Sequence, residues 1–152
     1  MKVSDILRVK GSTLYTVSPL DSLAEAVKVM AEKDIGSLVV IEHGELAGML
    51  TFREVIQATA EKTGAMDTMV VKSAMDDHPM TCTLETELDE VRRMMLDRHA
   101  RYMPVINQGM LMGVISLYDV AKAVVDSQNF ENKMHHPPSM STMVNCNLWQ
   151  RR

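Results

Sequence analysis

The chain has 152 residues and a formal net charge of −4, with 46% hydrophobic and only 4% aromatic residues. An acidic chain with so few aromatic side chains lacks the basic surface and the base-stacking rings that nucleic-acid binding requires. No run of 18 apolar residues forms a membrane span, the first residues lack the apolar core of a signal peptide, and two cysteines make no disulfide framework, so a cytoplasmic location is expected.

The first half of the chain alternates between strand and helix patterns. Ser22 and Glu25 form a capping-box signature, and the apolar residues that follow recur at the spacing of one helix face. Two nearly continuous apolar runs then flank a short turn, as in a hairpin whose sheet is covered on both faces. The expected elements are a short helix at 3–7, a strand at 14–17, a helix at 23–33, strands at 37–41 and 46–50, and a helix at 51–63.

The second half repeats this order after a short linker at 65–70. Its expected elements are a short helix at 71–75, a strand at 80–83, a helix with apolar Leu88, Val91 and Met95, strands at 103–106 and 111–115, and a helix at 117–127. The tail at 128–152 contains two adjacent prolines and is expected to be disordered or to dock on a partner. The boundaries are therefore 1–64 for the first repeat and 71–127 for the second.

The two halves are copies of one unit, offset by 65 positions. The offset superimposes many identical residues on the same hydrophobic pattern, far more than chance would place in register. The identical pairs include Thr16 and Thr81, Leu23 and Leu88, Met30 and Met95, Val40 and Val105, Gly44 and Gly109, Gly48 and Gly113, and Val55 and Val120.

Each hairpin ends at a corner where a hydroxyl and a carboxylate lie three residues apart. These are Thr51 and Glu54 in the first half, and Ser116 and Asp119 in the second. A carboxylate at a helix start can accept both hydroxyls of a ribose, while the hydroxyl and the helix N-terminal amides favour a phosphate. The same pairs match a capping box, which stabilises a helix start by about 1 kcal/mol with no ligand. Because the corner is doubled beside an apolar hairpin, ligand binding is preferred for Asp119, and both interpretations stay open for Glu54.

The doubled corner, GMLTFRE and GVISLYD, with a strand-turn-strand before each copy, resembles a tandem pair of CBS (cystathionine β-synthase) domains, the Bateman module. The resemblance covers about residues 1–126 and is to stand-alone bacterial-type CBS proteins. It implies an α/β (α+β) fold in which two β-α-β-β-α repeats pack as an intramolecular pseudo-twofold pair, with small mixed sheets covered by helices. A repeat of about 60 residues buries too little surface to be stable alone, so the halves are expected to fold together.

The resemblance also implies a function. It indicates a non-catalytic regulatory module that binds an adenosine-containing ligand in the cleft between the repeats and modulates a partner protein. AMP, ADP or ATP is the expected ligand, S-adenosylmethionine and NAD are further candidates, and no cofactor is required. The family commonly forms flat homodimers, which are expected here. The alternative is a structural dimerisation module whose pockets bind no ligand.

By the same resemblance, the ligand-binding residues form one set in each repeat. In the second repeat, Ser116 would hold phosphate and Asp119 ribose, and the base pocket would be lined by Thr81, Cys82, Tyr102, Met103 and Pro104. In the first repeat the corner residues would be Thr51, Arg53 and Glu54, and the pocket would be lined by Thr16, Val17, Ser37 and Leu38. Glu54 stands where the family most often has Asp, and Tyr118 stands where the first copy has Arg53, so the two sites are expected to differ, with the Asp119 site the principal one.

Further basic residues are candidate phosphate contacts: Arg98, His99, Arg101 and Lys10. The first three precede the second hairpin and would reach a phosphate from across the cleft. They equally fit the solvated C-terminal end of a helix, where cations are favoured. Both interpretations stay open.

Catalysis and metal binding find little support in the sequence. It contains no Gly-x-Ser-x-Gly elbow, Walker loop, His-Glu-x-x-His motif or Cys–His pair in a recognisable context, so no enzymatic activity is expected. The tail has soft metal ligands whose spacing matches no zinc pattern: Met134, His135, His136, Met140, Met143 and Cys146. Cys82 lies in an apolar strand and is expected to be inert core.

Overall fold

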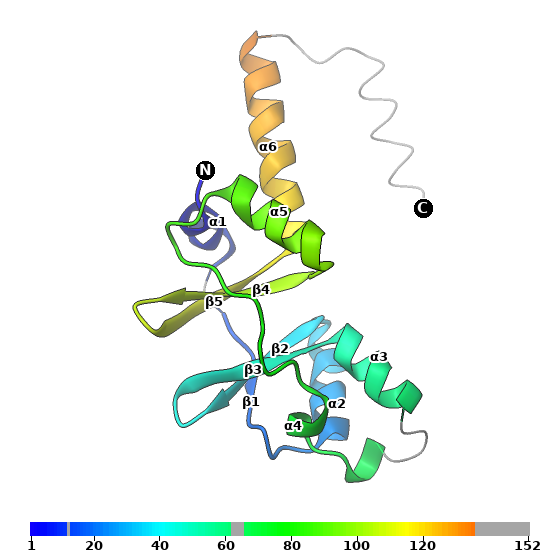
Figure 1. The fold of residues 1–152 in the computed structure, drawn as a ribbon. Coiled ribbons are helices and arrows are strands. Elements are labelled where there is room, and N and C mark those ends of the chain that lie inside the picture. The colour runs from blue at the N-terminus through cyan, green and yellow to red at the C-terminus, as the bar shows by residue number, and fades with distance from the viewer. Residues whose placement is uncertain (12, 62–65, 136–152) are drawn as a thin grey trace.

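The computed structural model describes residues 1–11, 13–61 and 66–135. Two units are stacked with their sheets in the middle and their helices at the outer ends (Figure 1). The elements of the first half are α1 (Val3–Lys10), β1 (Thr16–Val17), α2 (Leu23–Lys33), β2 (Ser37–Glu42), β3 (Glu45–Thr51) and α3 (Phe52–Glu61). Those of the second are the 3₁₀ turn η1 (Met66–Thr68), α4 (Val71–Ala74), α5 (Leu88–Arg98), β4 (Tyr102–Asn107), β5 (Met110–Ser116) and α6 (Leu117–His135). The expected α/β fold of two repeats with small mixed sheets is confirmed.

The two sheets differ at the first strand of each repeat. In the first repeat β1 pairs in parallel with β2, which pairs antiparallel with β3. In the second repeat β4 and β5 form an antiparallel pair, and the expected strand at 80–83 is reduced to one parallel bridge between Cys82 and Val105. The amide of Thr83 donates to the hydroxyl of Thr86, 3.0 Å away, just as the amide of Ser18 donates to Asp21 Oδ2 over 2.8 Å after β1.

Both hairpin turns have the same unusual backbone. His43 and Gly44 have φ angles of 53° and 78°, and Gln108 and Gly109 have φ angles of 50° and 79°. Positive φ at both central residues is the type I′ geometry, whose twist matches that of the flanking strands. Glycine at the second position carries no Cβ that would clash at this φ angle. The two turns have the same φ angles, and the duplication seen in the sequence thus extends to the backbone.

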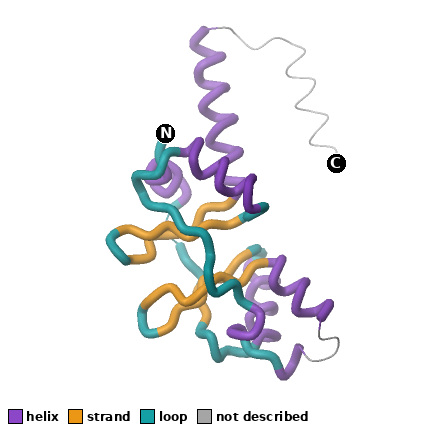
Figure 2. Tube along the Cα trace, in the orientation of Figure 1, coloured by secondary structure: helices purple, strands orange, loops and turns teal. Residues whose placement is uncertain are grey.

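Each unit has its own hydrophobic core, and the two short leading helices are exchanged between these cores. Val3 and Ile6 of α1 pack into the core built by α5, β4, β5 and α6. Met69 and Val71 pack into the core built by α2, β2, β3 and α3. Figures 1 and 2 show α1 beside α5 and α6 at one end of the molecule, and α4 beside α2 at the other.

Matching backbone hydrogen bonds hold the two exchanged helices. The amide of Val3 donates to the carbonyl of Thr86 over 3.0 Å, and the amide of Val71 donates to the carbonyl of Asp21 over 2.9 Å. Thr86 and Asp21 are equivalent under the 65-residue offset. Each leading helix therefore docks on the same loop of the opposite repeat, and neither repeat has a complete core without the other.

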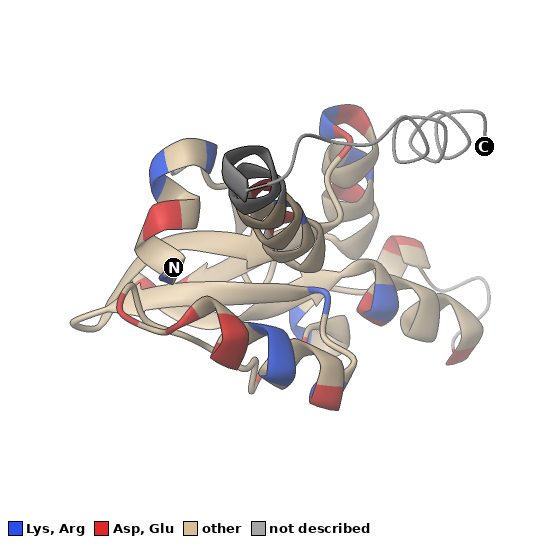
Figure 3. Cartoon of the chain, turned by 90° about the horizontal axis from the view of Figure 1, so that it is seen from above, with Lys and Arg blue, Asp and Glu red and all other residues tan. Residues whose placement is uncertain are grey.

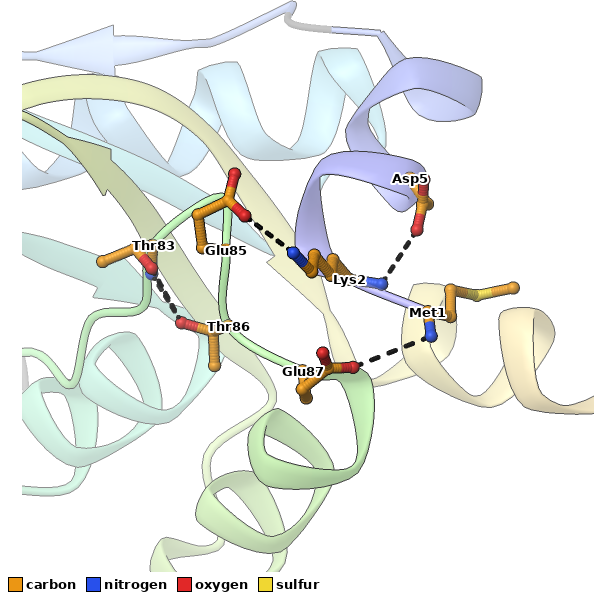
Figure 4. A network of polar contacts seen from close by, with 7 residues as sticks. All are labelled: Met1, Lys2, Asp5, Thr83, Glu85, Thr86 and Glu87. Carbon is orange, nitrogen blue, oxygen red and sulfur yellow. Dashed lines mark hydrogen bonds and ion pairs between the residues drawn. The ribbon is translucent and has the colours of Figure 1, made fainter.

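Polar contacts at the chain start add to the docking of α1 (Figure 4). The Lys2 ammonium lies 2.8 Å from the Glu85 carboxylate, and the terminal amine of Met1 lies 3.7 Å from that of Glu87. The Lys2 amide also donates to Asp5 over 2.9 Å. The charged groups of both ion pairs are well exposed, so buried Val3 and Ile6, rather than these pairs, are the main source of the docking energy.

Two helices are longer than the sequence patterns indicate. The helix expected at 3–7 continues to Lys10 because Arg8 and Lys10 are good helix formers, and it ends where Gly11 takes a φ of 90°. The helix expected to end at 127 continues to His135, because the chain offers no proline or glycine between them. The end of the helix expected at 51–63 and the tail beyond His135 lie outside the described residues. Within those residues, no helix is both long and apolar enough to cross a membrane.

Because α1 packs into the core of the second repeat, truncation of a buried side chain of α1 should destabilise that core. Val3 is completely buried, so Val3→Ala leaves a cavity and should lower the free energy of unfolding by about 2 kcal/mol. Val9 lies on the same helix with 86% of its surface exposed, and Val9→Ala should cost less than about 0.5 kcal/mol. Urea unfolding followed by circular dichroism measures both. Equal effects of the two variants would show that α1 is not part of that core.

Candidate functional site

Both strand-to-helix corners are closed by hydrogen bonds of the capping type. The amide of Ser116 donates to Asp119 Oδ2 over 2.9 Å, and the amide of Asp119 donates back to Ser116 Oγ over 3.1 Å. In the first corner the amide of Thr51 donates to Glu54 Oε2 over 2.9 Å, and the Thr51 hydroxyl donates to the same oxygen. The capping interpretation is thus confirmed for both pairs, and a ligand at either corner would have to share these groups.

The carboxylate of Asp119 also holds Lys10, at the end of α1. Lys10 Nζ lies 2.6 Å from Asp119 Oδ2 and donates to the carbonyl of Val114 over 2.9 Å. Partial burial raises the pKa of Asp119, but the bonds from Lys10 and Ser116 outweigh it and leave the pKa below its usual value. All of these contacts use Oδ2, so within the described residues Oδ1 stays available to a hydroxyl donor.

A cavity of about 530 Å³ lies beside the first corner, and we call it the first cavity. Thr51, Arg53 and Glu54 form its first-repeat side. The second repeat contributes the end of α5 with the loop that follows, and also Asp76 and residues 78–80 from the segment between α4 and α5. The members with basic or acidic side chains are Arg53, His78, Arg98, His99, Arg101, Glu54 and Asp76.

A second cavity of about 650 Å³ lies beside the second corner. Ser116 and the first turn of α6 line one side, and Lys10 with residues 13–15 lines another. The first repeat adds residues 35–37 and Val39. Each cavity therefore joins the corner of one repeat to the residues that open the hairpin of the other.

This crossed arrangement divides the residues predicted from the sequence. Those that line the first cavity are Thr51, Arg53, Glu54, Arg98, His99 and Arg101. Those that line the second are Ser116, Lys10 and Ser37, and Tyr102 and Arg101 line both, while Asp119 reaches the second cavity through its bond to Lys10. Ser37 lines the second cavity together with Ser116, and it is also the cross-strand partner of Thr51 at the corner of its own repeat.

The remaining predicted residues line neither cavity: Thr16, Val17, Leu38, Thr81, Cys82, Met103 and Pro104. Leu38 and Met103 are buried in the two cores, because the central strands are covered on both faces. Cys82 is also core, and burial raises its pKa to about 12, in line with the expected inert thiol. A ligand role for these seven residues stays a prediction without support from the cavity lining.

Sequence reasoning missed several lining residues, some from the first turns of α3 beside the corner and others from the opposite repeat. They include Phe52, Gln57, His78 and Met80 in the first cavity, and Tyr15, Ile35 and Gly36 in the second. His78 Nδ1 lies 2.9 Å from Asp77 Oδ1, and this hydrogen bond raises the pKa of His78. The 65-residue offset was the available signal, since it places Gly36 opposite Arg101 about the pseudo-twofold axis.

One wall separates the two cavities. It is formed by Arg101 and Tyr102, which belong to both linings. The hydroxyl of Tyr102 lies so close to Gly36 that a Cβ placed there would approach it to 1.8 Å, and the Phe52 ring lies on the same side. Burial raises the pKa of Tyr102, so its hydroxyl stays neutral and can both donate and accept hydrogen bonds.

The charge on the Asp119 carboxylate predicts a pH-dependent contribution to stability. Because the folded-state pKa lies below the unfolded value near 3.9, the contribution is present above that value and is lost as the pH falls through the folded pKa. Asp119→Asn should cost about 1 kcal/mol at pH 7, since Lys10 is partly exposed, and the difference from wild type should shrink below about pH 4. Urea unfolding at pH 7, 5 and 3 measures it, with Asp126→Asn on the exposed face of α6 as the control. A difference that does not change with pH would contradict the ion pair.

The buried Cys82 thiol predicts very slow chemical labelling. With a pKa of about 12, roughly one thiol in ten thousand is ionised at pH 8, and only the thiolate reacts. In a Cys146→Ser background, iodoacetamide should leave the native protein unmodified for hours and alkylate it rapidly in urea. Fast alkylation of the native protein would place Cys82 at the surface.

The chain is similar in sequence and in structure to known proteins. The chain is 35% identical over 127 residues to a 17.7 kDa protein of Acidianus ambivalens, covering 82% of this chain and 74% of that one. It is 29% identical to the CBS domain-containing protein YhcV of Bacillus subtilis, covering 78% and 84%. The crystal structure of a CBS-domain-containing protein from Agrobacterium tumefaciens superimposes with a TM-score of 0.79 at 32% identity, covering 82% and 99%.

Two more distant structures contain ligands. CBSX2 was crystallised in complex with AMP, and matches with a TM-score of 0.71 at 23% identity, covering 84% of this chain and 98% of that one. The CBS domain pair of protein MJ0100 was crystallised with 5′-methylthioadenosine and S-adenosyl-L-methionine, and matches with a TM-score of 0.73 at 21% identity, covering 84% and 98%. At these identities the likeness shows the fold alone.

The family itself is shown by the sequence match along both repeats. The family model of the CBS domain matches residues 3–61 and again residues 71–126. These two ranges contain every strand of the structure and both corners. The chain therefore belongs to the CBS domain family and contains two copies of the domain in tandem.

Proposed function

We propose that this protein is a non-catalytic regulatory module that binds an adenosine-containing ligand between its two repeats, with AMP, ADP or ATP as the leading candidates. One observation carries the proposal: two cavities lie between the repeats, each joining a hydroxyl-bearing helix start of one repeat to a polar wall of the other. The relatives crystallised with AMP, 5′-methylthioadenosine and S-adenosyl-L-methionine support the adenosyl class.

In this proposal each corner binds the ribose of the ligand and the group attached at its 5′ end. The Thr51 and Ser116 hydroxyls and the helix N-termini beside them face that group, which is a phosphate in a nucleotide. The Asp119 carboxylate accepts a ribose hydroxyl through Oδ1 while Oδ2 keeps its bond to Ser116. Glu54 is the corresponding carboxylate of the first cavity. The adenine lies against the apolar and aromatic part of each lining.

The position of the cavities gives ligand binding a route to a partner protein. A ligand that contacts both repeats stabilises one arrangement of the two units over others, and only such differential binding transmits a signal. A homodimer fits the exposed apolar residues of α3 and α6, which are Phe52, Ile56, Tyr118 and Val125. The regulated partner would respond to that dimer surface.

A second candidate function is favoured by the second corner. Lys10 already neutralises the Asp119 carboxylate over 2.6 Å, and both corners are satisfied as helix caps without any ligand. A module with empty pockets that serves only as a dimerisation platform would have the same contacts. The two functions differ in whether small molecules stabilise the fold.

Thermal melting separates the two candidates. The protein is melted with millimolar AMP, ATP, NAD or S-adenosylmethionine. A compound present at 100 times its Kd adds about 2.7 kcal/mol to the free energy of unfolding, which raises the Tm by several degrees. Asp119→Asn and Glu54→Gln, tested one at a time, should abolish the shift for the cavity that is occupied, while Asp126→Asn keeps it. If none of the four compounds raises the Tm, the dimerisation platform remains as the function. If both corner variants keep the full rise in Tm, the ligand binds at a site other than the two corners.

A further inference from the structure

The two cavities differ most at a pair of equivalent residues. Arg53 and Tyr118 each follow their corner hydroxyl by two positions and are related by the 65-residue offset. Arg53 lines the first cavity and Tyr118 lines the second. Both side chains are exposed, and so their identity is set neither by a core nor by a helix cap.

The first cavity gathers guanidinium groups that have no carboxylate partner. Arg53 comes from α3, while Arg98 and Arg101 approach from the end of α5 and the loop after it. Within the described part of the chain, none of the three forms an ion pair. Glu54 and Asp76 also line this cavity, but neither forms an ion pair with these guanidinium groups, since Glu54 accepts the hydrogen bonds of its own corner and Asp76 accepts the amide of His78. Three guanidinium groups against two carboxylates leave the lining with a net positive charge. In Figure 3 the charged residues of both signs lie mainly on the helices.

The second cavity is organised for an uncharged group. Its lysine, Lys10, is already held by Asp119 and by the carbonyl of Val114. All three tyrosines of the chain line it: Tyr15, Tyr102 and Tyr118. Tyrosine rings stack on a purine base and their hydroxyls bond to a nucleoside, but they cannot neutralise a phosphate. Arg101 is the one cation left unpaired in this lining, and it also belongs to the first cavity.

We propose that the two cavities sort adenosyl ligands by charge: the first cavity takes the phosphate-bearing ligand through Arg53, Arg98 and Arg101, and the second takes an adenosyl ligand without phosphate. The inference rests on the proposed function and assigns a ligand class to each cavity. Three guanidiniums from two repeats match a phosphate group, since each can donate two parallel hydrogen bonds to its oxygens. Arg53 and Tyr118 are then the specificity-determining pair.

Isothermal titration of the full chain with AMP and with adenosine tests the proposal. In Arg53→Tyr and, independently, in Arg98→Gln, the Kd for AMP should rise at least tenfold while the Kd for adenosine changes less than twofold. In Tyr118→Ala the Kd for adenosine should rise more than the Kd for AMP. Arg92→Gln is the matched control, because Arg92 is an exposed arginine of α5, paired with Asp89 over 3.5 Å, that lines neither cavity. The Tm of each variant without ligand confirms that it is folded.

Three results would overturn the inference, and they separate it from the proposed function. If wild type binds AMP and both arginine variants bind it unchanged, the sorting by charge is wrong and the adenosyl-binding function stands. If Tyr118→Ala raises the Kd for AMP more than the Kd for adenosine, the phosphate-bearing ligand occupies the second cavity. If wild type binds neither AMP nor adenosine at millimolar concentration, the proposed function fails, and the sorting fails with it.

Discussion

Burial of one valine from each leading helix in the opposite core is the constraint on which the rest of this structure depends. Val3 and Val71 are both completely buried, and each lies in the core of the repeat that follows or precedes its own. The hydrophobic free energy of either core therefore includes residues of the other half. The two units cannot separate without opening both cores, so the packing of both cores determines the space between them.

The packing of the two units places the two cavities. Each corner is the cross-strand neighbour of the segment that opens its own hairpin, and across the cavity it also faces the corresponding segment of the other repeat. The same packing brings Lys10 from α1 to the second corner, where it pairs with Asp119. No lysine from a leading helix pairs with Glu54 in the first cavity, because α4, the leading helix of the second repeat, is shorter and ends at Ala74. The unequal electrostatics of the two sites thus begin with the unequal lengths of two helices.

The local elements were predictable because their signals lie close together in the sequence. The capping box at Ser22, the hairpins and the doubled corner all depend on residues within a few positions of each other, and the offset of 65 made each copy support the other. The exchange of α1 and α4 was not predictable in this way. Val3 and Val71 show only that each helix has an apolar face, and the partner that covers this face is chosen by long-range packing. Ser37 and Tyr102 were assigned to their own corners, which they adjoin as cross-strand partners, but their contribution to the cavity of the other repeat was not foreseen. The reduction of the strand at Cys82 to a single bridge had no signal in the sequence.

Gly36 and Ser37 occupy the positions that Arg101 and Tyr102 occupy in the second repeat, and the two pairs differ greatly in size. The Tyr102 hydroxyl fills the volume that a Cβ at position 36 would need. The interface between the repeats can therefore accommodate the tyrosine only because its neighbour in the other repeat has no side chain, which makes the asymmetry of these two segments a steric condition of the observed packing.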